Sequence, residues 1–187
     1  LWLVFALFFR DPERVIKSSA DEILSPADGV IKDIEYIINE KENEYSGGAA
    51  LVRIGIFLSV FDVHINRAPC KMEISEKIYR KGKFHDARNP IASTENEAVT
   101  IVGNADIVGN KFVLIVRQIA GAIAKKVVCE PEIGTSLEKG ERYGMIKLGS
   151  RTELYLPACS DFLINVQIGQ KVFAGKSVLA KYVKVVK

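Results

Sequence analysis

The stretch VQIGQKVFAGKSVLA (Val166–Ala180), near the C-terminal end, carries the clearest signal of the fold class. Gly169 and Gly175 stand on either side of a short segment around Val172. Glycine lacks a Cβ atom and therefore supports the tight turns that bound very short strands. A second stretch, SPADGVIKDI (Ser25–Ile34), likewise opens a strand directly after a turn. The two stretches together predict a β domain built from many brief strands.

Short apolar or alternating runs recur through the rest of the chain, and Gly, Pro, Asn or charged clusters separate them. Spacing of this kind is typical of a β barrel or sandwich. We therefore expect a mostly β domain like a barrel-sandwich hybrid, with a few short helices. RQIAGAIAKK (Arg117–Lys126) is the segment expected to form a short helix. The runs are Gly29–Ile38, Leu51–Leu58, Ala98–Val102, Lys111–Val116, Lys126–Cys129, Leu154–Leu156 and Val178–Val186.

Composition narrows the possible functions. A chain of 187 residues is long enough for one well-buried domain, so we expect a single domain over 1–187. The net charge of +3 comes from scattered lysines and gives no sign of a nucleic-acid footprint, although weak attraction to anionic lipid is compatible with it. The three cysteines, Cys70, Cys129 and Cys159, lack CxxC spacing. They indicate reduced thiols rather than a zinc site or a disulfide framework.

The N-terminal stretch LWLVFALFF (residues 1–9) is apolar throughout and runs into Arg10. Nine residues are about half of a bilayer span. The stretch is therefore either a buried strand or a truncated membrane-proximal segment, and a basic residue after it suits a cytosolic flank. Two linkers are also expected. Asn39–Ala50 looks like a hairpin loop, and Tyr79–Glu97 is long enough to be a functional lid or a solvated loop.

His64 and His85 are the only histidines, so any histidine-based proton transfer must use one of them. In an extended segment, Asp62, His64 and Asn66 project to one face because the side-chain period of a strand is two. That arrangement places a carboxylate beside the imidazole. The alternative is a histidine at a strand end that bonds to a loop. His85 lies in a polar loop and is expected to be exposed, and Asp28 sits in a turn before Gly29.

The run YGMIKLGSRTELYLP (Tyr143–Pro157) reads as a strand broken by Gly149 and Ser150. No G-x-S-x-G pattern surrounds the serine, so ordinary serine-hydrolase chemistry is weakly supported. A serine after glycine can instead attack the carbonyl of the preceding residue, because glycine tolerates strained backbone angles. Gly-Ser pairs are also common in turns, and the pair alone does not decide between these interpretations.

Five motifs occur together in one order: FFRDPER (Phe8–Arg14), SPADG (Ser25–Gly29), FLSVFDVHINRAPC (Phe57–Cys70), ENE (Glu95–Glu97) and GMIKLGSRTELYLP (Gly144–Pro157). In these motifs the chain resembles the phosphatidylserine decarboxylases, in particular the shorter prokaryotic type. The motifs span about residue 8 to residue 157, and the glycine-rich tail also fits.

The resemblance implies a proenzyme that cuts itself between Gly149 and Ser150. Attack of the Ser150 hydroxyl on the Gly149 carbonyl would give an ester, and β-elimination and hydrolysis would then leave a pyruvoyl group. Residues 1–149 would become the β subunit and residues 150–187 the α subunit. The pyruvoyl group, the only cofactor implied, would form a Schiff base with phosphatidylserine and release phosphatidylethanolamine. No metal is implied. The expected location is the cytoplasmic face of the cell membrane, and a homodimer is compatible with the resemblance.

Carried onto this chain, the family's self-cleavage relay corresponds to Asp28 and His64 acting with Ser150. Two positions depart from the pattern of longer bacterial relatives. Arg67 stands where those relatives have a second histidine, so His64 would serve both self-cleavage and decarboxylation, or one task would fall elsewhere. Arg151 stands where many have Ser or Thr, and it would either hold a substrate carboxylate or phosphate or be a plain surface residue.

Three other functions compete with this interpretation. A sugar phosphotransferase phosphocarrier domain can share the SPADG turn, but it needs two neighbouring histidines. A non-catalytic β domain at the membrane would leave the contexts of Asp28, His64 and Ser150 as coincidences. A pyruvoyl decarboxylase of a soluble amino acid would not need the apolar N-terminus. Self-cleavage separates the first two from a decarboxylase, and substrate choice separates the third.

Overall fold

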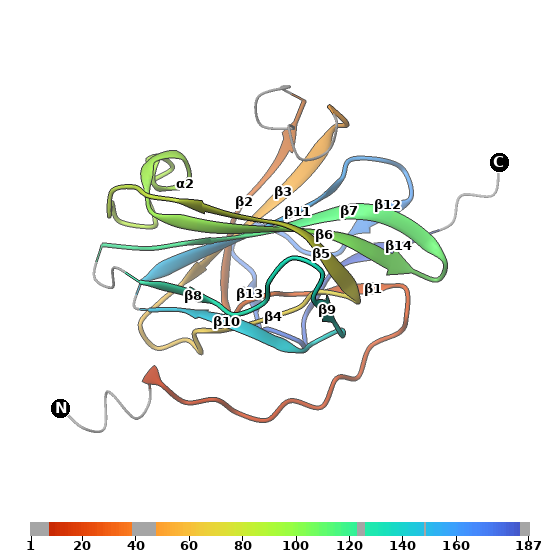
Figure 1. The fold of residues 1–187 in the computed structure, drawn as a ribbon, viewed down its shortest axis with the longest axis horizontal. Coiled ribbons are helices and arrows are strands. Elements are labelled where there is room, and N and C mark those ends of the chain that lie inside the picture. The colour runs from red at the N-terminus through yellow and green to blue at the C-terminus, as the bar shows by residue number, and fades with distance from the viewer. Residues whose placement is uncertain (1–7, 39–47, 123–125, 148, 184–187) are drawn as a thin grey trace.

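A strongly curled sheet dominates the computed structural model, which describes residues 8–38, 48–122, 126–147 and 149–183 (Figure 1). All its neighbouring strands pair antiparallel, and within the described residues the sheet has eight strands. The curl makes the sheet a half-barrel with a concave inner face. In spatial order the strands are β13 (Lys171–Val172), β2 (Gly29–Ile37), β3 (Leu51–Leu58), β11 (Ser150–Pro157), β7 (Asn110–Ile119), β6 (Ala98–Ile107), β5 (Met72–Arg80) and β9 (Ser136–Leu137).

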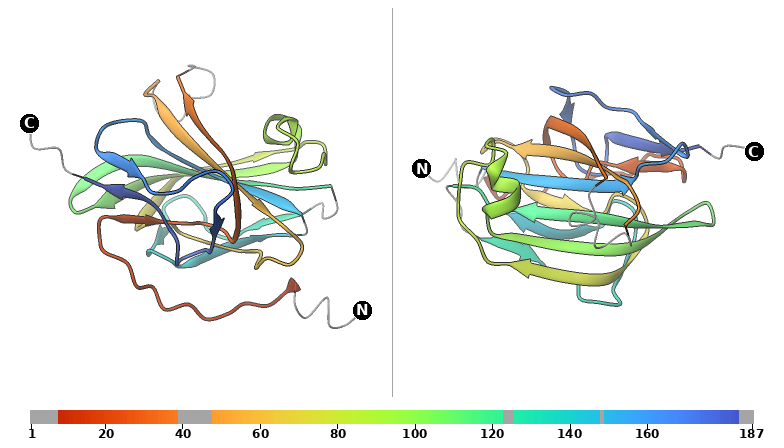
Figure 2. Two further views of the ribbon diagram at one scale, coloured as in Figure 1. Left: turned by 180° about the vertical axis from the view of Figure 1, so that it is seen from behind. Right: turned by 90° about the horizontal axis from the view of Figure 1, so that it is seen from above.

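Two three-stranded sheets lie beside the large sheet (Figure 2). Buried residues of both belong to the same hydrophobic core as the large sheet. In spatial order the first has β1 (Glu22–Leu24), β14 (Val178–Tyr182) and β12 (Phe162–Ile164), and the second has β4 (Ile65–Arg67), β10 (Arg142–Ile146) and β8 (Val127–Cys129). The helix α2 (Ile91–Glu95) lies in the connection between β5 and β6. The expectation of a mostly β domain with few helices is confirmed.

The two glycine-bounded stretches that predicted the fold meet in the large sheet. Val172 of β13 pairs with Gly29 of β2, and Lys171 pairs with Val30. A Cβ atom at Gly29 would lie 2.2 Å from the main-chain oxygen of Phe57. Glycine is therefore required where the start of β2 approaches the main chain of its neighbour β3 closely.

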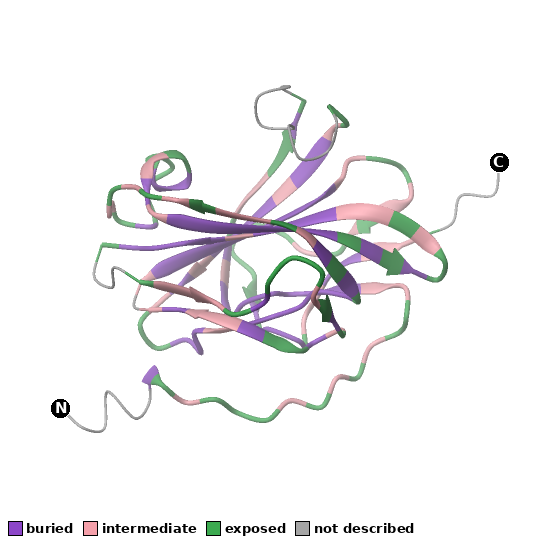
Figure 3. Cartoon of the chain, viewed as in Figure 1, coloured by how far each residue is buried: buried purple, intermediate pink, exposed green. Residues whose placement is uncertain are grey.

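The core follows the period-two alternation of the central strands. Ile54, Ile56 and Leu58 of β3 face inward and are fully buried, and Leu154 and Leu156 of β11 lie on the same inner face. The buried strands run through the centre of the molecule (Figure 3). By the same alternation Ser150, at the start of β11, shares this inner face with Leu154.

The opposite, outer face of β11 carries a buried ionic cluster centred on Glu153. The Glu153 carboxylate is fully buried and accepts hydrogen bonds from Arg151 Nε (2.8 Å), Ser93 Oγ of α2 (2.6 Å) and the Tyr155 hydroxyl (2.7 Å). The guanidinium groups of Arg117 and Arg53 lie 3.7 and 3.9 Å away. Burial alone would raise the pKa of Glu153, but the neighbouring guanidinium groups outweigh it and lower the pKa.

Removing the charge at the centre of this cluster should be costly. We expect Glu153→Leu to lower the free energy of unfolding by about 3–5 kcal/mol. The substitution leaves the buried guanidinium groups around position 153 without the negative charge that they share. The matched control is Glu35→Leu, which removes a half-exposed carboxylate paired with Arg53 at 2.7 Å and should cost about 1 kcal/mol or less. Urea unfolding in a Ser150→Ala background keeps a single chain throughout. Equal losses in both variants would contradict the central role of Glu153.

The expected helix over Arg117–Lys126 is wrong where the structure describes it, because Arg117, Gln118 and Ile119 complete β7 between β6 and β11. Tertiary pairing overrides the local helix propensity there. The expected hairpin is confirmed by the pairing of Ile37 with Leu51, although residues 39–47 lie outside the described part. The predicted strand runs match β2, β3, β6, β7, β8, β11 and β14; the bounds of β3 agree at both ends, and the other strands differ from their runs at one or both ends.

The N-terminal segment from Phe8 onward runs along the outside of the sheets before β1 (Figures 1 and 2). Buried or half-buried arginines fix it: Arg67 donates to the Pro12 oxygen (3.2 Å), and Arg14 reaches across to Asp28. Of the predicted segment 1–9, residues 1–7 lie outside the described part. The described residues contain no helix that is long and apolar enough to cross a bilayer.

Candidate active site

The Gly-Ser break lies where the chain passes from one sheet to another. Strand β10 ends at Ile146 in a small sheet, and β11 begins at Ser150 in the large sheet, between β3 and β7. Gly149 has a φ of +66°, in the left-handed region that favours glycine. The broken strand expected from the sequence is therefore confirmed, and the crossing explains the break.

A second crossing meets the first at the same corner. Ser150 pairs with Leu58 at the end of β3, and Met145 pairs with Ile65 at the start of β4. The segment between Leu58 and Ile65 therefore spans the same two sheets as the segment between Met145 and Ser150. Its last residue is His64, whose main-chain oxygen accepts a hydrogen bond from the Ile146 N–H (3.2 Å). The two ladders thus bring the predicted residues His64 and Ser150 to one corner.

His64 is fully buried in the form that a general base requires. Its Nδ1 lies 2.8 Å from the main-chain oxygen of Asp62. A carbonyl can only accept a hydrogen bond, so Nδ1 carries the proton and Nε2 of the neutral ring keeps its lone pair. Nε2 has no hydrogen-bond partner among the described residues.

The surroundings of His64 favour the neutral ring. Burial lowers the pKa of His64 to about 4. It outweighs the hydrogen bond that Nδ1 donates to the Asp62 oxygen and the charges of Asp62 and Asp28, which act in the opposite direction. The buried ring of Phe8 packs against the imidazole with the two ring centroids 4.3 Å apart. The N-terminal segment therefore helps to keep water from His64.

The expected extended segment around Asp62 is wrong, although the charge of Asp62 does raise the pKa of His64 against the larger effect of burial. Ser59 to Asp62 form a turn rather than extended chain, closed by the Asp62 N–H donating to the Ser59 oxygen (3.0 Å). The Asp62 carboxylate accepts from the N–H and hydroxyl of Ser59, both at 2.8 Å, and pairs with Lys171. Asp62 therefore orients His64 through its main-chain oxygen and not through its carboxylate.

Asp28 is also buried, and its partners are fixed. The carboxylate accepts hydrogen bonds from both terminal nitrogens of Arg14 (2.6 and 2.8 Å) and from the Ala174 N–H (2.8 Å). Within the described residues no hydrogen bond joins Asp28 to His64 or Ser150. Its charge nevertheless raises the pKa of His64 against the larger effect of burial. Asp28 therefore acts on the imidazole through its charge and not through contact.

Ser150 lies above a buried polar network on the inner face. Its hydroxyl is buried and has no hydrogen-bond partner among the described residues. Thr152 lies two residues further along β11, and its Oγ1 accepts a hydrogen bond from Asn66 Nδ2 (3.1 Å). Asn66 Oδ1 in turn accepts a hydrogen bond from Gln118 Nε2 (2.9 Å). Sequence reasoning missed Gln118 and Thr152. An amide inside the apolar strand run Val113–Ile119 was the available signal.

The two departures from the family pattern have structural partners. Arg151 projects to the face opposite Ser150, where it binds Asp33 through both terminal nitrogens, each at 2.7 Å, and Glu153 through Nε. The surface alternative for Arg151 is therefore wrong, because the side chain is buried and its guanidinium is paired with Asp33 and Glu153. Arg67 is buried as well, and it donates to the main-chain oxygens of Gly140 and Pro12.

The second histidine and the cysteines lie apart from this corner. His85 is only half-buried, and its Nε2 lies 3.1 Å from Glu95. All three cysteines are free, and burial raises the pKa of Cys70 to about 12. No group of three or more His, Cys, Asp or Glu residues in the described ranges is placed to hold a metal ion.

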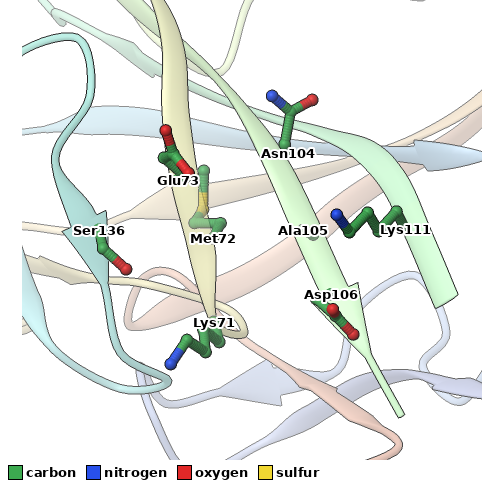
Figure 4. Close-up of a pocket in the computed structure, with 8 residues that line it drawn as sticks. All are labelled: Lys71, Met72, Glu73, Asn104, Ala105, Asp106, Lys111 and Ser136. Carbon is green, nitrogen blue, oxygen red and sulfur yellow. The ribbon is translucent and has the colours of Figure 1, made fainter. Parts of the chain in front are cut away.

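A surface pocket of about 420 Å³ lies at the other end of the large sheet (Figure 4). Arg151 pairs with Ile119 and Ile119 with Ala98, whereas the pocket lies by Ala105, seven residues or about 23 Å further along β6. The pocket is thus remote from Ser150. Its lining residues are Lys71, Met72, Glu73, Asn104, Ala105, Asp106, Lys111 and Ser136.

Comparison with known proteins identifies the family. The family model described as phosphatidylserine decarboxylase matches residues 1–180. The phosphatidylserine decarboxylase proenzyme of Geotalea daltonii is 41% identical over 172 residues, which are 92% of this chain and 76% of that protein. The proenzymes of a Wolbachia from Brugia malayi and of Rickettsia akari are 40% and 38% identical, over 95% and 97% of this chain and 75% of each relative. The chain therefore belongs to the phosphatidylserine decarboxylase family.

Proposed function

We propose that this chain is a proenzyme that cuts itself between Gly149 and Ser150 and then converts phosphatidylserine into phosphatidylethanolamine. One observation carries the proposal: Ser150 Oγ and His64 Nε2 are both buried, have no hydrogen-bond partner among the described residues, and lie at the same corner of the fold. One is a proton donor and the other has the lone pair to accept that proton. A buried polar group without a partner is costly, so such groups call for an explanation in function.

Self-cleavage begins with the transfer of the Ser150 hydroxyl proton to His64 Nε2. The Ser150 oxygen then bonds to the Gly149 carbonyl carbon, the Gly149–Ser150 C–N bond breaks, and the Ser150 nitrogen takes up a proton. The result is an ester between the two residues. Apart from its chain neighbours, no described residue lies within 4 Å of a Cβ atom added at Gly149, so another described segment does not pack against that side of the residue.

Elimination across the ester would release the Gly149 carboxylate, and hydrolysis with loss of ammonia would leave a pyruvoyl group at position 150. The site fits this group, because position 150 is buried and no described residue forms a hydrogen bond with its side chain. A pyruvoyl group supplies a carbonyl that takes up the substrate amine and the electrons released with carbon dioxide. His64, neutral and fixed through Nδ1, is the residue placed to move protons at this corner.

The same geometry would hold the two fragments together after the cut. Residues 150–157 form β11, which pairs with β3 on one side and β7 on the other. Glu153 and Arg151 lie on the 150–187 side of the cut, whereas Arg53, Arg117 and Asp33 lie on the 1–149 side. The ionic cluster therefore joins the proposed α and β subunits directly behind position 150.

Asp28 is proposed to support this corner from the N-terminal side. Its ion pair with Arg14 ties the N-terminal segment down, and that segment carries Phe8 onto His64. The negative charge of the Asp28 carboxylate also stabilises the protonated imidazole that forms when His64 takes the serine proton. The homodimer and the location at the cytoplasmic face stay predictions from the resemblance.

The phosphocarrier alternative is disfavoured by geometry. It needs two neighbouring histidines, whereas His64 is fully buried and His85 is bound to Glu95 at the partly exposed β5–β6 connection. A pyruvoyl decarboxylase of soluble amino acids would use the same corner and is separated only by its substrate. The test incubates the cut protein with phosphatidylserine vesicles or with free amino acids and follows carbon dioxide. Release from free serine but not from the lipid would overturn the proposed substrate.

The pH dependence of self-cleavage tests the state of His64. Because burial lowers the pKa of His64 to about 4, we expect a cleavage rate that shows no inflection near pH 6.5 and falls only as the pH approaches 4. Unfolded His64 binds its proton near pH 6.5 and the folded residue near 4, so stability should decrease as the pH falls between these values. Mass analysis of freshly synthesised precursor at each pH gives the rate. An inflection near pH 6.5 would show a solvated imidazole.

A further inference from the structure

Apolar side chains protrude around the corner that holds Ser150 and His64. Phe61, at the tip of the turn before His64, is 80% exposed, and Val60 beside it is also exposed. Phe9, next to the buried Phe8, is 48% exposed. We call Phe9, Val60 and Phe61 the apolar rim. Each rim residue is three or four residues from His64 or adjacent to Phe8, so the rim borders the candidate site.

Cations surround the apolar rim. Arg10 donates from Nη2 to the main-chain oxygen of Phe61 (2.6 Å), and Lys147 Nζ lies 5.9 Å from the centre of the Phe9 ring. Lys171, itself exposed, pairs with the Asp62 carboxylate of the same turn, and that carboxylate is buried. The surface around the apolar rim therefore presents both exposed apolar side chains and basic side chains.

We propose that the apolar rim inserts into the surface of an anionic lipid bilayer while Arg10, Lys147 and Lys171 contact the lipid headgroups. This inference rests on the proposed function, because a lipid substrate must reach the corner from a membrane. Aromatic side chains flanked by basic residues suit the interface between headgroups and acyl chains. Docking at the rim would present the phosphatidylserine headgroup to Ser150 while its acyl chains stay in the bilayer.

The charge pattern favours a bilayer over a protein partner. Basic groups attract an anionic surface in any orientation, whereas a protein interface needs a large, shaped patch. The rim has only three apolar residues and lies on two separate segments, the N-terminal segment and the turn before His64. If the protein bound a partner protein through the rim and did not bind lipid, the rim would be a protein interface and not a membrane-docking surface.

Vesicle binding tests the rim directly. We compare Ser150→Ala, which cannot turn over lipid, with Phe61→Ser in the same background, using sedimentation with vesicles of phosphatidylcholine and 30% phosphatidylglycerol. Loss of one inserted phenylalanine should weaken binding by about tenfold or more. The matched control is Tyr36→Ser, because Tyr36 is 69% exposed and pairs with Val52 toward the far end of β3. Equal binding by all three proteins would overturn the proposal.

An activity measurement separates docking from chemistry. In otherwise unchanged protein, Phe61→Ser should cut itself normally and should turn over short-chain, monomeric phosphatidylserine within about twofold of the parent. Turnover of phosphatidylserine in vesicles should fall by about tenfold. An equal loss on both substrates would assign Phe61 to the site or the fold and not to docking. If the parent acts on neither lipid, the proposed function fails, whereas vesicle binding still judges the rim.

Discussion

Ser150→Ala is expected to give a folded, uncut chain that releases no carbon dioxide from phosphatidylserine. The variant removes both the nucleophile for self-cleavage and the atoms from which the pyruvoyl group would form. Folding should survive, because the Ser150 hydroxyl is buried and makes no hydrogen bond within the described residues. Removal of an unsatisfied buried hydroxyl is neutral or slightly stabilising. Denaturing mass analysis and carbon dioxide release measure the two effects.

The control for this variant is Ser160→Ala, which removes an exposed hydroxyl from the same C-terminal part of the chain. We expect that control to be cut and active like the parent. A Ser150→Ala protein that was still cut, or that still decarboxylated the lipid, would show that the carbonyl group arises at another residue.

His64→Ala is expected to slow self-cleavage by about 10²–10⁴-fold, the usual contribution of a positioned general base. Nε2 of His64 carries a lone pair and has no hydrogen-bond partner among the described residues. The hydrogen bond from Nδ1 to the Asp62 main-chain oxygen fixes the orientation of the ring. His64→Gln keeps more of the side-chain volume against Phe8 and should be slow as well, which separates loss of the base from loss of packing. The measurement is the disappearance of precursor with time after cell-free synthesis.

The matched control is His85→Ala, because His85 is half-buried beside Glu95 and plays no part in the proposed reaction. It should cut at the parental rate within about twofold. Dividing carbon dioxide release by the fraction of cut chain then shows whether His64 also serves in turnover. Processing of His64→Ala at the parental rate would remove His64 from the activating role.

Much of the fold was predictable because its strands are locally encoded. The apolar and alternating runs predicted β2, β3, the first half of β6 and the centre of β7, and the glycine-bounded stretches correctly indicated tight strand turns. Strand β5 was missed, because MEISEKIYR carries four charged residues in nine and lies towards the edge of the sheet, where one side meets water. The helix expected from Arg117 failed for a different reason. Residues 117–119 instead pair with β11, which is distant in sequence.

The site was predictable only in part. The motifs predict Ser150, His64 and Asp28 as site residues, but they do not predict the contacts that set the charge and orientation of these side chains. Phe8 packs on His64, and Arg14 forms an ion pair with Asp28. Each contact joins two segments that are distant in sequence and become neighbours only in the complete fold. A period-two argument also assumed extended chain where Ser59–Asp62 form a turn. Local patterns give residue types, whereas burial and long-range partners decide the charge and orientation of each group.

The intact mass of the purified protein under denaturing conditions tests the central claim most directly. The account predicts two species, because the 38 residues from 150 to 187 should separate as a fragment of about 4 kDa from the 20.7 kDa chain. The small fragment should carry a blocked N-terminus that reacts with ketone reagents. A single uncut species of 20.7 kDa from protein that decarboxylates phosphatidylserine would contradict the account.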